Sequence, residues 1–232
     1  MKIQTKNKIV IIGAGGLGKG IAQLIIDLNK VEDVWELLGY LDDDINLRGK
    51  TVNNYPVLGQ IELLADRKFH DVYAMSAIGL SSGRIQIIRK ALEMNRNLRF
   101  PTLIHPTAII GEETEIGEGT SVGAYAIVEP GNRIGSHVLV HYGTTIGHDC
   151  VIEDFSTVLP GTNVSGFVKL CYGTYLGTNV SVLPGVEVGT RTIVGAGAAV
   201  IHSLPAYCTA VGVPAKLIKY HDEVAASRMG GE

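Results

Sequence analysis

The sequence is poor in cysteine and in large aromatic side chains. Its 232 residues include three cysteines, one tryptophan and four phenylalanines. The cysteines, Cys150, Cys171 and Cys208, are odd in number and have neither CxxC spacing nor a histidine in zinc-finger register. Neither a disulfide framework nor a zinc site is therefore predicted, and we interpret the three residues as structural thiols. So few tryptophan and phenylalanine residues predict a core of small and β-branched side chains.

The chain also lacks a strong charge imbalance and a long apolar run. Twenty basic and 23 acidic side chains give a net charge of −3, so no positive field that attracts nucleic acid or anionic lipid is expected. No apolar segment approaches the length of a bilayer span, and the first residues lack the apolar core of a secretory signal. We therefore predict a cytoplasmic protein that has no nucleic-acid partner and no membrane span.

Glycine, in contrast, is abundant, with 29 residues, and the first 100 residues alternate strand-like and helix-like segments. Hydrophobic periodicity predicts strands at Lys8–Ile12, Leu37–Leu41 and Asp71–Met75, and helices at Leu17–Leu28 and Gly83–Met94. This alternation predicts an α/β domain over residues 1–100, with a small, mostly parallel sheet covered by helices. Pro101 and Pro106 interrupt any helix or central strand and mark a domain boundary.

The first predicted strand leads into a glycine-rich turn. Gly13, Gly15, Gly16 and Gly18 allow the backbone to approach a phosphate, and the following helix presents its N-terminus to the charge. A dinucleotide-binding enzyme would also have an acid after its second strand, and Asp42 lies 24 residues after Gly18 (42 − 18), so spacing alone does not exclude NAD. The residues before the boundary are too few for a complete dinucleotide site. We therefore favour anion binding over hydride transfer.

Residues 101–220 are predicted to form a second domain, in which the sequence follows a strict period of six. Aliphatic residues occupy all 17 positions from Ile104 to Val200 in steps of six. Glycine often follows the aliphatic residue, which we attribute to a sharp bend of the chain, and a small residue usually stands four places after it. A repeat this short predicts a β-helix with a narrow interior. A purely structural solenoid is the alternative.

Several motifs, in order along nearly the whole chain, resemble the PglD/NeuD family of hexapeptide-repeat sugar acyltransferases. They are IIGAGGLGKG, GYLDDD, YPVLG and SAIG before the boundary, and GHDCVIEDFSTVLPGTNVSG and GVPAK after it. The resemblance implies an N-terminal α/β half-Rossmann-like domain that binds a sugar nucleotide. It also implies an all-β, left-handed parallel β-helix that binds acetyl-CoA and assembles as a homotrimer. Such a helix has three hexads per coil, so residues 18 apart stack.

A histidine is the expected base for acetyl transfer to an amine, because its ordinary pKa lies near neutrality. His148 stands at an exterior corner and is followed by Asp149, which resembles the catalytic histidine–acid pair of the family. The resemblance implies that His148 takes the proton and that Asp149 orients its ring. One coil further, 148 + 18 gives Gly166, whose N–H we expect to receive the thioester oxygen.

The resemblance also implies contacts to the sugar nucleotide. Asp42 and Asp43 become candidates for base recognition, with solvated turn acids as the alternative for both. Gly79 of SAIG is placed near the phosphate turn. His141 becomes a candidate contact to the sugar, and it is also the alternative base.

At two positions the chain departs from the family pattern, and the contacts that the family makes there are expected to be weaker or absent. Leu17 stands where the family often has a histidine, and Thr157 stands where PglD-like members have a second one. For acetyl-CoA, the small corners of the later coils and the lysine of GVPAK make Gly166, Gly177, Ala196, Gly212 and Lys216 the candidates. No metal is implied.

These observations predict an N-acetyltransferase acting on a UDP-linked amino-deoxy sugar made for surface glycan synthesis. The alternative within enzymes is O-acetylation of sialic acid or a related sugar. The alternative outside enzymes is a sugar-nucleotide-binding scaffold without activity. Residues 221–232 are expected to cover the end of the β-helix or to be partly disordered.

Overall fold

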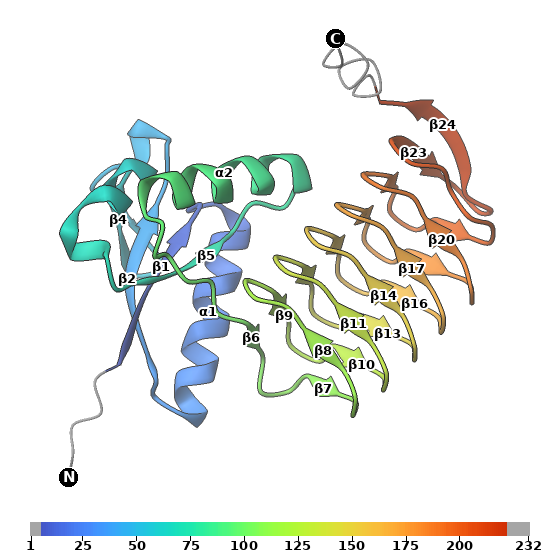
Figure 1. Cartoon of the computed structure of the whole chain (residues 1–232), viewed down its shortest axis with the longest axis horizontal. Helices are drawn as coiled ribbons and strands as arrows, with labels where there is room; N and C mark the ends of the chain where they lie inside the picture. Colours follow the sequence, from blue (N-terminus) through green and yellow to red (C-terminus); the bar gives the residue numbers. More distant parts are fainter. Residues whose placement is uncertain (1–5, 222–232) are drawn as a thin grey trace. The chain divides into compact units, whose positions relative to one another are not determined.

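The computed structural model describes residues 6–221, so nearly all of the predicted tail at 221–232 lies outside the described residues. The chain forms two compact units, one ending at Pro106 and the other beginning at Thr107. Figure 1 shows helices and a sheet in the first unit and repeated short strands in the second. The predicted order, an α/β domain followed by a β-helix, is confirmed.

The first unit contains a five-stranded sheet in the order β3-β4-β2-β1-β5. Its strands are β1 (Asn7–Ile12), β2 (Trp35–Leu41), β3 (Thr51–Val52), β4 (Tyr55–Gly59) and β5 (Tyr73–Ser76). All neighbours pair in parallel except β3 and β4. The helices are α1 (Gly16–Val31) and α2 (Ser81–Met94), with short 3-10 helices η1 (Ile45–Leu47), η2 (Ile61–Ala65) and η3 (Arg67–Phe69). Every strand and helix predicted for this unit is present, although β3, β4 and the 3-10 helices were not predicted.

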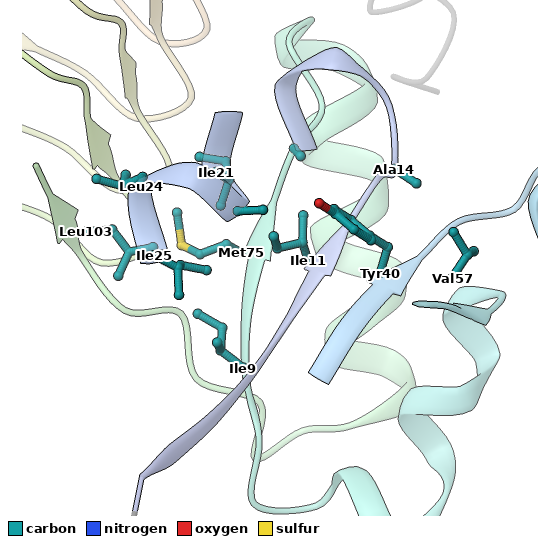
Figure 2. Close-up of a cluster of buried hydrophobic side chains, with 12 residues drawn as sticks. Ile9, Ile11, Ala14, Ile21, Leu24, Ile25, Tyr40, Val57, Met75 and Leu103 are labelled. Atoms are coloured by element: carbon teal, nitrogen blue, oxygen red, sulfur yellow. The ribbon is translucent and has the colours of Figure 1, made fainter. Parts of the chain in front are cut away.

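The core of this unit lies between the sheet and α1 (Figure 2). Ile9 and Ile11 of β1 share a face because strand side chains alternate, and they pack in one buried cluster with Ile21 and Ile25 of α1. The short strand β6 (Leu103–Ile104) adds Leu103 to the same cluster. Burial of each such side chain contributes about 1.5–3 kcal/mol. This packing fixes the carboxyl ends of β1, β2 and β5 at one edge of the sheet, where α/β proteins bind ligands.

The second unit is built from two-residue strands that recur every six residues. They are β7 (Ile109–Ile110), β8 (Glu115–Ile116), β9 (Ser121–Val122), β10 (Ile127–Val128), β11 (Arg133–Ile134), β12 (Leu139–Val140), β13 (Thr145–Ile146), β14 (Val151–Ile152), β15 (Thr157–Val158), β16 (Asn163–Val164), β17 (Lys169–Leu170), β18 (Tyr175–Leu176), β19 (Ser181–Val182), β20 (Glu187–Val188), β21 (Ile193–Val194) and β22 (Ala199–Val200). The second residue of each is the predicted aliphatic one. A hairpin of β23 (Cys208–Val211) and β24 (Lys216–Tyr220) follows.

These strands form the three faces of a β-helix, and neighbouring strands within each face are parallel. Face 1 contains β7, β10, β13, β16, β19 and β22; face 2 contains β8, β11, β14, β17 and β20; face 3 runs from β9 through β12, β15, β18 and β21 to the hairpin. Pairing joins residues 18 apart, as in Val128 with Ile146 and Ile146 with Val164. The predicted stacking of three hexads per coil is therefore confirmed.

The narrow interior is filled by the aliphatic residues and by the small residues four places later. Thr120 and Thr162 are fully buried, and their hydroxyls donate hydrogen bonds to the carbonyls of Gly135 (2.8 Å) and Gly177 (2.9 Å). These bonds remove the cost of burying a hydroxyl group. The three cysteines are free thiols and buried, and burial raises the pKa of the Cys150 and Cys171 thiols.

The glycines that follow the aliphatic residues have a different cause from the bend predicted above. A Cβ on Gly117 would lie 2.6 Å from the carbonyl carbon of Gly135, in the backbone of the next coil. The bend occurs two residues later, where residues such as Tyr125, Asp149 and Phe167 adopt φ values of 57°, 55° and 59°. The bend prediction was therefore wrong at these positions, which require glycine for close contact between coils.

Gly117→Ala is expected to destabilise the protein by about 1–3 kcal/mol, because backbone atoms cannot move aside as a side chain can. Urea unfolding followed by circular dichroism measures this change. Gly20→Ala is the control: its Cβ would meet no atom within 4 Å, and the position lies inside α1. It should stabilise by at most about 1 kcal/mol. Equal stability of Gly117→Ala and wild type would contradict the contact.

Candidate active site

His148 lies in the corner between β13 on face 1 and β14 on face 2. Its Nδ1 is 2.8 Å from Oδ2 of Asp149, and both side chains are about half exposed. A carboxylate only accepts hydrogen bonds, so Nδ1 carries the proton in the neutral ring and Nε2 keeps its lone pair. This arrangement gives Nε2 the chemistry of a general base.

Gly166 stacks directly on His148 in the next coil. A Cβ built on Gly166 would lie 2.8 Å from Nε2 and 2.9 Å from Cε1 of His148. Within residues 6–221, the Gly166 N–H donates no hydrogen bond. The structure thus brings His148, Asp149 and Gly166 together at one corner, with an imidazole nitrogen beside a backbone N–H.

The coil below holds the backbone of this corner in place. The N–H of His148 donates to Oε2 of Glu129 at 2.9 Å, and the N–H of Cys150 donates to Oδ1 of the fully buried Asn132 at 3.0 Å. Between them, the Asp149 N–H donates to the carbonyl of the residue that follows Glu129. Three consecutive amides are therefore fixed, which holds in place the backbone from which the imidazole projects.

Phe167 adds an aromatic wall to the corner. Its ring meets the His148 ring edge-on, with centroids 4.8 Å apart, and it is 62% exposed. Sequence reasoning did not single out Phe167 or Asn132. The 18-residue step could have found both, because Phe167 lies one step after Asp149 and Asn132 one step before Cys150.

The structure places three other candidates at a different corner. His141 follows β12 and Gly177 follows β18, so both lie where face 3 turns into face 1. Ala196 stacks on Gly177, whose Cβ would lie 2.6 Å from the Ala196 backbone nitrogen. Within one chain this corner is separate from the His148 corner, and face 1 lies between them. His141 and Gly177 are therefore not part of the His148 cluster.

Gly212 and Lys216 lie in and after the turn of the β23–β24 hairpin. Gly212 adopts φ of 97°, which favours glycine, and Lys216 is the exposed first residue of β24. An exposed ammonium at this place can meet a phosphate group. Binding of CoA by these residues stays a prediction.

The glycine-rich turn of the first unit fits an anion. Gly13 adopts φ of 107°, and a Cβ on Gly18 would collide with the Gly13 carbonyl oxygen. In contrast, a Cβ on Gly15 or Gly16 would meet no atom within 4 Å. Gly15 caps α1 without a side-chain hydrogen bond, and the first turn has no acid. The N–H groups of this helix end are therefore available to a negative charge.

Asp42 and Asp43 both have partners inside the protein. Oδ2 of Asp42 accepts a hydrogen bond from the Ala14 N–H at 2.7 Å, which ties the end of β2 to the glycine-rich turn. Asp43 accepts from the Ile61 N–H at 3.2 Å and from the Lys90 ammonium at 3.3 Å. The structure thus gives each acid a positioning role, and recognition of a nucleotide base by either one stays a prediction.

The SAIG loop follows β5 beside the glycine-rich turn. A Cβ on Gly13 would lie 3.1 Å from the Ala77 carbonyl oxygen, whereas a Cβ on Gly79 would meet no atom within 4 Å. Gly79 therefore borders open space near the turn. Two residues depart from the family pattern in the sequence. Leu17 packs against the core of the first unit, and Thr157 is fully buried in β15.

Residues 6–221 include no group of three or more histidine, cysteine, aspartate or glutamate side chains placed to hold a metal ion. In the same residues, no helix combines the length and apolar character needed to cross a bilayer.

Comparison with known proteins gives consistent matches. A family model described as the PglD N-terminal domain matches residues 8–91. A UDP-N-acetylbacillosamine N-acetyltransferase of Bacillus subtilis (strain 168) is 38% identical over 118 residues, which are 50% of this chain and 51% of that protein. The chain thus matches about half the length of this curated relative.

Solved structures match over nearly the whole chain. The acetyltransferase domain of PglB from Neisseria gonorrhoeae FA1090, in complex with acetyl coenzyme A, is 30% identical, with a TM-score of 0.82 over 92% of this chain and 100% of that one. A variant of perosamine N-acetyltransferase from Caulobacter crescentus, in complex with CoA and GDP-perosamine, is 28% identical, with a TM-score of 0.83 over 93% and 98% of the two chains.

The α/β unit followed by a β-helix of six-residue repeats, together with these matches, assigns the chain to the hexapeptide-repeat acyltransferase class. Within this class, the chain belongs to the PglD/NeuD family of sugar acyltransferases, as the sequence motifs predicted.

Proposed function

We propose that this chain is an acetyl-CoA-dependent N-acetyltransferase whose acceptor is an amino sugar linked to a nucleotide. The observation that carries the proposal is the His148 corner, where Nε2 lies beside Gly166 and the Gly166 N–H has no partner within residues 6–221. Two kinds of similarity support the proposal. The curated relative is named as an N-acetyltransferase of a UDP-sugar, and the similar solved structures contain acetyl coenzyme A or GDP-perosamine.

In the proposed reaction the amine of the sugar attacks the thioester carbonyl of acetyl-CoA. A C–N bond forms, and Nε2 of His148 takes the proton that the amine loses. Asp149 stabilises the resulting imidazolium, and the Gly166 N–H donates to the oxyanion of the tetrahedral intermediate. The C–S bond then breaks, and the proton held by His148 passes to the CoA thiolate.

For the nucleotide, we propose that the glycine-rich turn and the N-terminus of α1 bind the diphosphate. UDP is the expected nucleotide, because the curated relative acts on a UDP-sugar. GDP is the alternative, since the Caulobacter structure contains GDP-perosamine.

We also propose a homotrimer. Face 1 separates the two corners that contain candidate residues, so one CoA molecule reaches both most simply between two chains. Exposed apolar side chains on or beside this face support such contact, namely Ile109, Tyr125, Ile127 and Tyr142. Sedimentation equilibrium should give three times the mass of the chain.

Release of free CoA tests the proposed reaction. UDP- and GDP-linked amino-deoxy sugars should each be incubated with acetyl-CoA, with mass spectrometry to detect the acetylated product. We expect turnover of one nucleotide-linked amine and none of the matching sugar that lacks the amine. Turnover of sialic acid alone would instead support O-acetylation. Nucleotide binding without any CoA release would support a scaffold.

A further inference from the structure

Arg84 heads the largest fully buried side chains, with 1% of its surface exposed. Burying a guanidinium is costly unless it makes hydrogen bonds. Its Nη1 donates one hydrogen bond to the carbonyl oxygen of Ile78 and another, at 2.9 Å, to the carbonyl oxygen of Gly79. Burial lowers the pKa of Arg84 to about 10, so the group stays protonated at neutral pH. A buried cation thus binds the SAIG loop from the inside.

These hydrogen bonds fix the direction of two peptide groups. The peptide unit is planar and trans, so its C=O and N–H point in opposite directions. Because the Ile78 and Gly79 carbonyls face the guanidinium, the N–H groups of Gly79 and Leu80 face away from it. Leu80 is also the N-cap of α2, which has no side-chain cap and no acid in its first turn. The Gly79 and Leu80 amides of the loop and the N-terminal amides of α2 therefore form one set of hydrogen-bond donors.

This set lies next to the glycine-rich turn. Strands β1 and β5 are neighbours, and the Ala77 N–H donates to the Ile12 carbonyl at 2.8 Å. The next residue after Ile12 is Gly13, which the Ala77 carbonyl approaches. The carboxyl ends of two adjacent strands thus lead to two helices whose first turns contain no acidic residue, an arrangement that favours an anion with more than one phosphate.

We propose that Arg84 is a positioning residue of the nucleotide site, and that it turns the Gly79 and Leu80 amides toward the diphosphate held at the glycine-rich turn. The inference rests on the proposed function and names a residue that acts on its substrate without touching it. Arg84 would then determine affinity for the nucleoside diphosphate and leave binding of CoA, which is assigned to the other unit, unchanged.

Isothermal titration with UDP, GDP and CoA tests this role. In Arg84→Met, the dissociation constant for the diphosphate that wild type binds should rise about tenfold or more, since hydrogen bonds to a charged group contribute about 1.5–3 kcal/mol. Arg84→Lys keeps the charge with fewer donors and should be intermediate. Arg89→Met is the matched control, because Arg89 is an exposed arginine of the same helix. It should bind like wild type.

Wild-type affinity for the diphosphate in Arg84→Met and Arg84→Lys would overturn the inference and leave the proposed function intact. A parallel loss of CoA binding in a variant that stays folded by circular dichroism would also overturn it, because the effect would then not be specific to the nucleotide site. If Arg84→Met does not fold, Arg84→Lys decides: weaker diphosphate binding than in Arg89→Lys supports the role, and equal binding refutes it. Absence of nucleotide binding by wild type would instead count against the proposed function.

Discussion

His148→Asn should lower kcat for acetyl transfer by about 10²–10⁴-fold, the usual contribution of a general base. The substitution removes Nε2, the atom beside Gly166, and leaves a small polar side chain at a half-exposed position. The dissociation constant for CoA and the midpoint of thermal unfolding should not change. Steady-state kinetics at saturating acetyl-CoA and sugar nucleotide measure the effect.

His70→Asn is the control for this experiment, because His70 is exposed and belongs to the other unit. It should keep the wild-type kcat. His141→Asn separates the two base candidates: loss of kcat in His141→Asn, with wild-type kcat in His148→Asn, would transfer the role of base to the other corner.

Gly166→Ala keeps the backbone N–H, but its methyl group should hold the thioester oxygen away from that N–H. We therefore expect kcat to fall by about 10²-fold or more, the usual cost of losing one hydrogen bond to the oxyanion. The new methyl group would lie 2.8 Å from Nε2 of His148, in the space where the thioester carbonyl must approach. Stability should change little, because the methyl group meets an imidazole that is half exposed and can move away. Kinetics and thermal unfolding of the same preparation test both statements.

Gly147→Ala provides the contrast, since its Cβ would lie 2.6 Å from the backbone nitrogen of Gly166. Backbone cannot rotate away, so this variant should lose stability as well as activity. A Gly166→Ala protein that unfolds as readily as Gly147→Ala, or that keeps full kcat, would contradict the proposed geometry.

The β-helix could be predicted from the sequence because its signal is local and repeated. Each aliphatic residue from Ile110 to Val200 is the second residue of a strand, and a shift of one residue would move it out of the interior. The same period predicted the neighbourhood of His148 and Gly166, although they are separated by 18 residues. In the first unit, alternating apolar segments were enough to predict β1, α1, β2, β5 and α2.

Features that depend on contacts between distant residues were not predictable in the same way. Glycine is required at position 117 because the backbone of the next coil lies too close for a Cβ. The local sequence pattern does not distinguish a glycine needed for this close contact from a glycine needed for a bend of the chain. Asp42 has its partner at Ala14, 28 residues away. Arg84 reads as one more polar residue at the start of a helix, because only the fold buries it.

The 18-residue turn of the second unit has a consequence for changes in its length. One residue inserted between Cys150 and Ser165 would set Ser165 opposite His148 and move the glycine amide past the imidazole. Adding or deleting 18 residues beyond this region would instead leave the pair undisturbed. The segment between His148 and Gly166 can therefore not change its length by one residue without separating the pair, so the proposed chemistry depends on the spacing of these residues as much as on their identity.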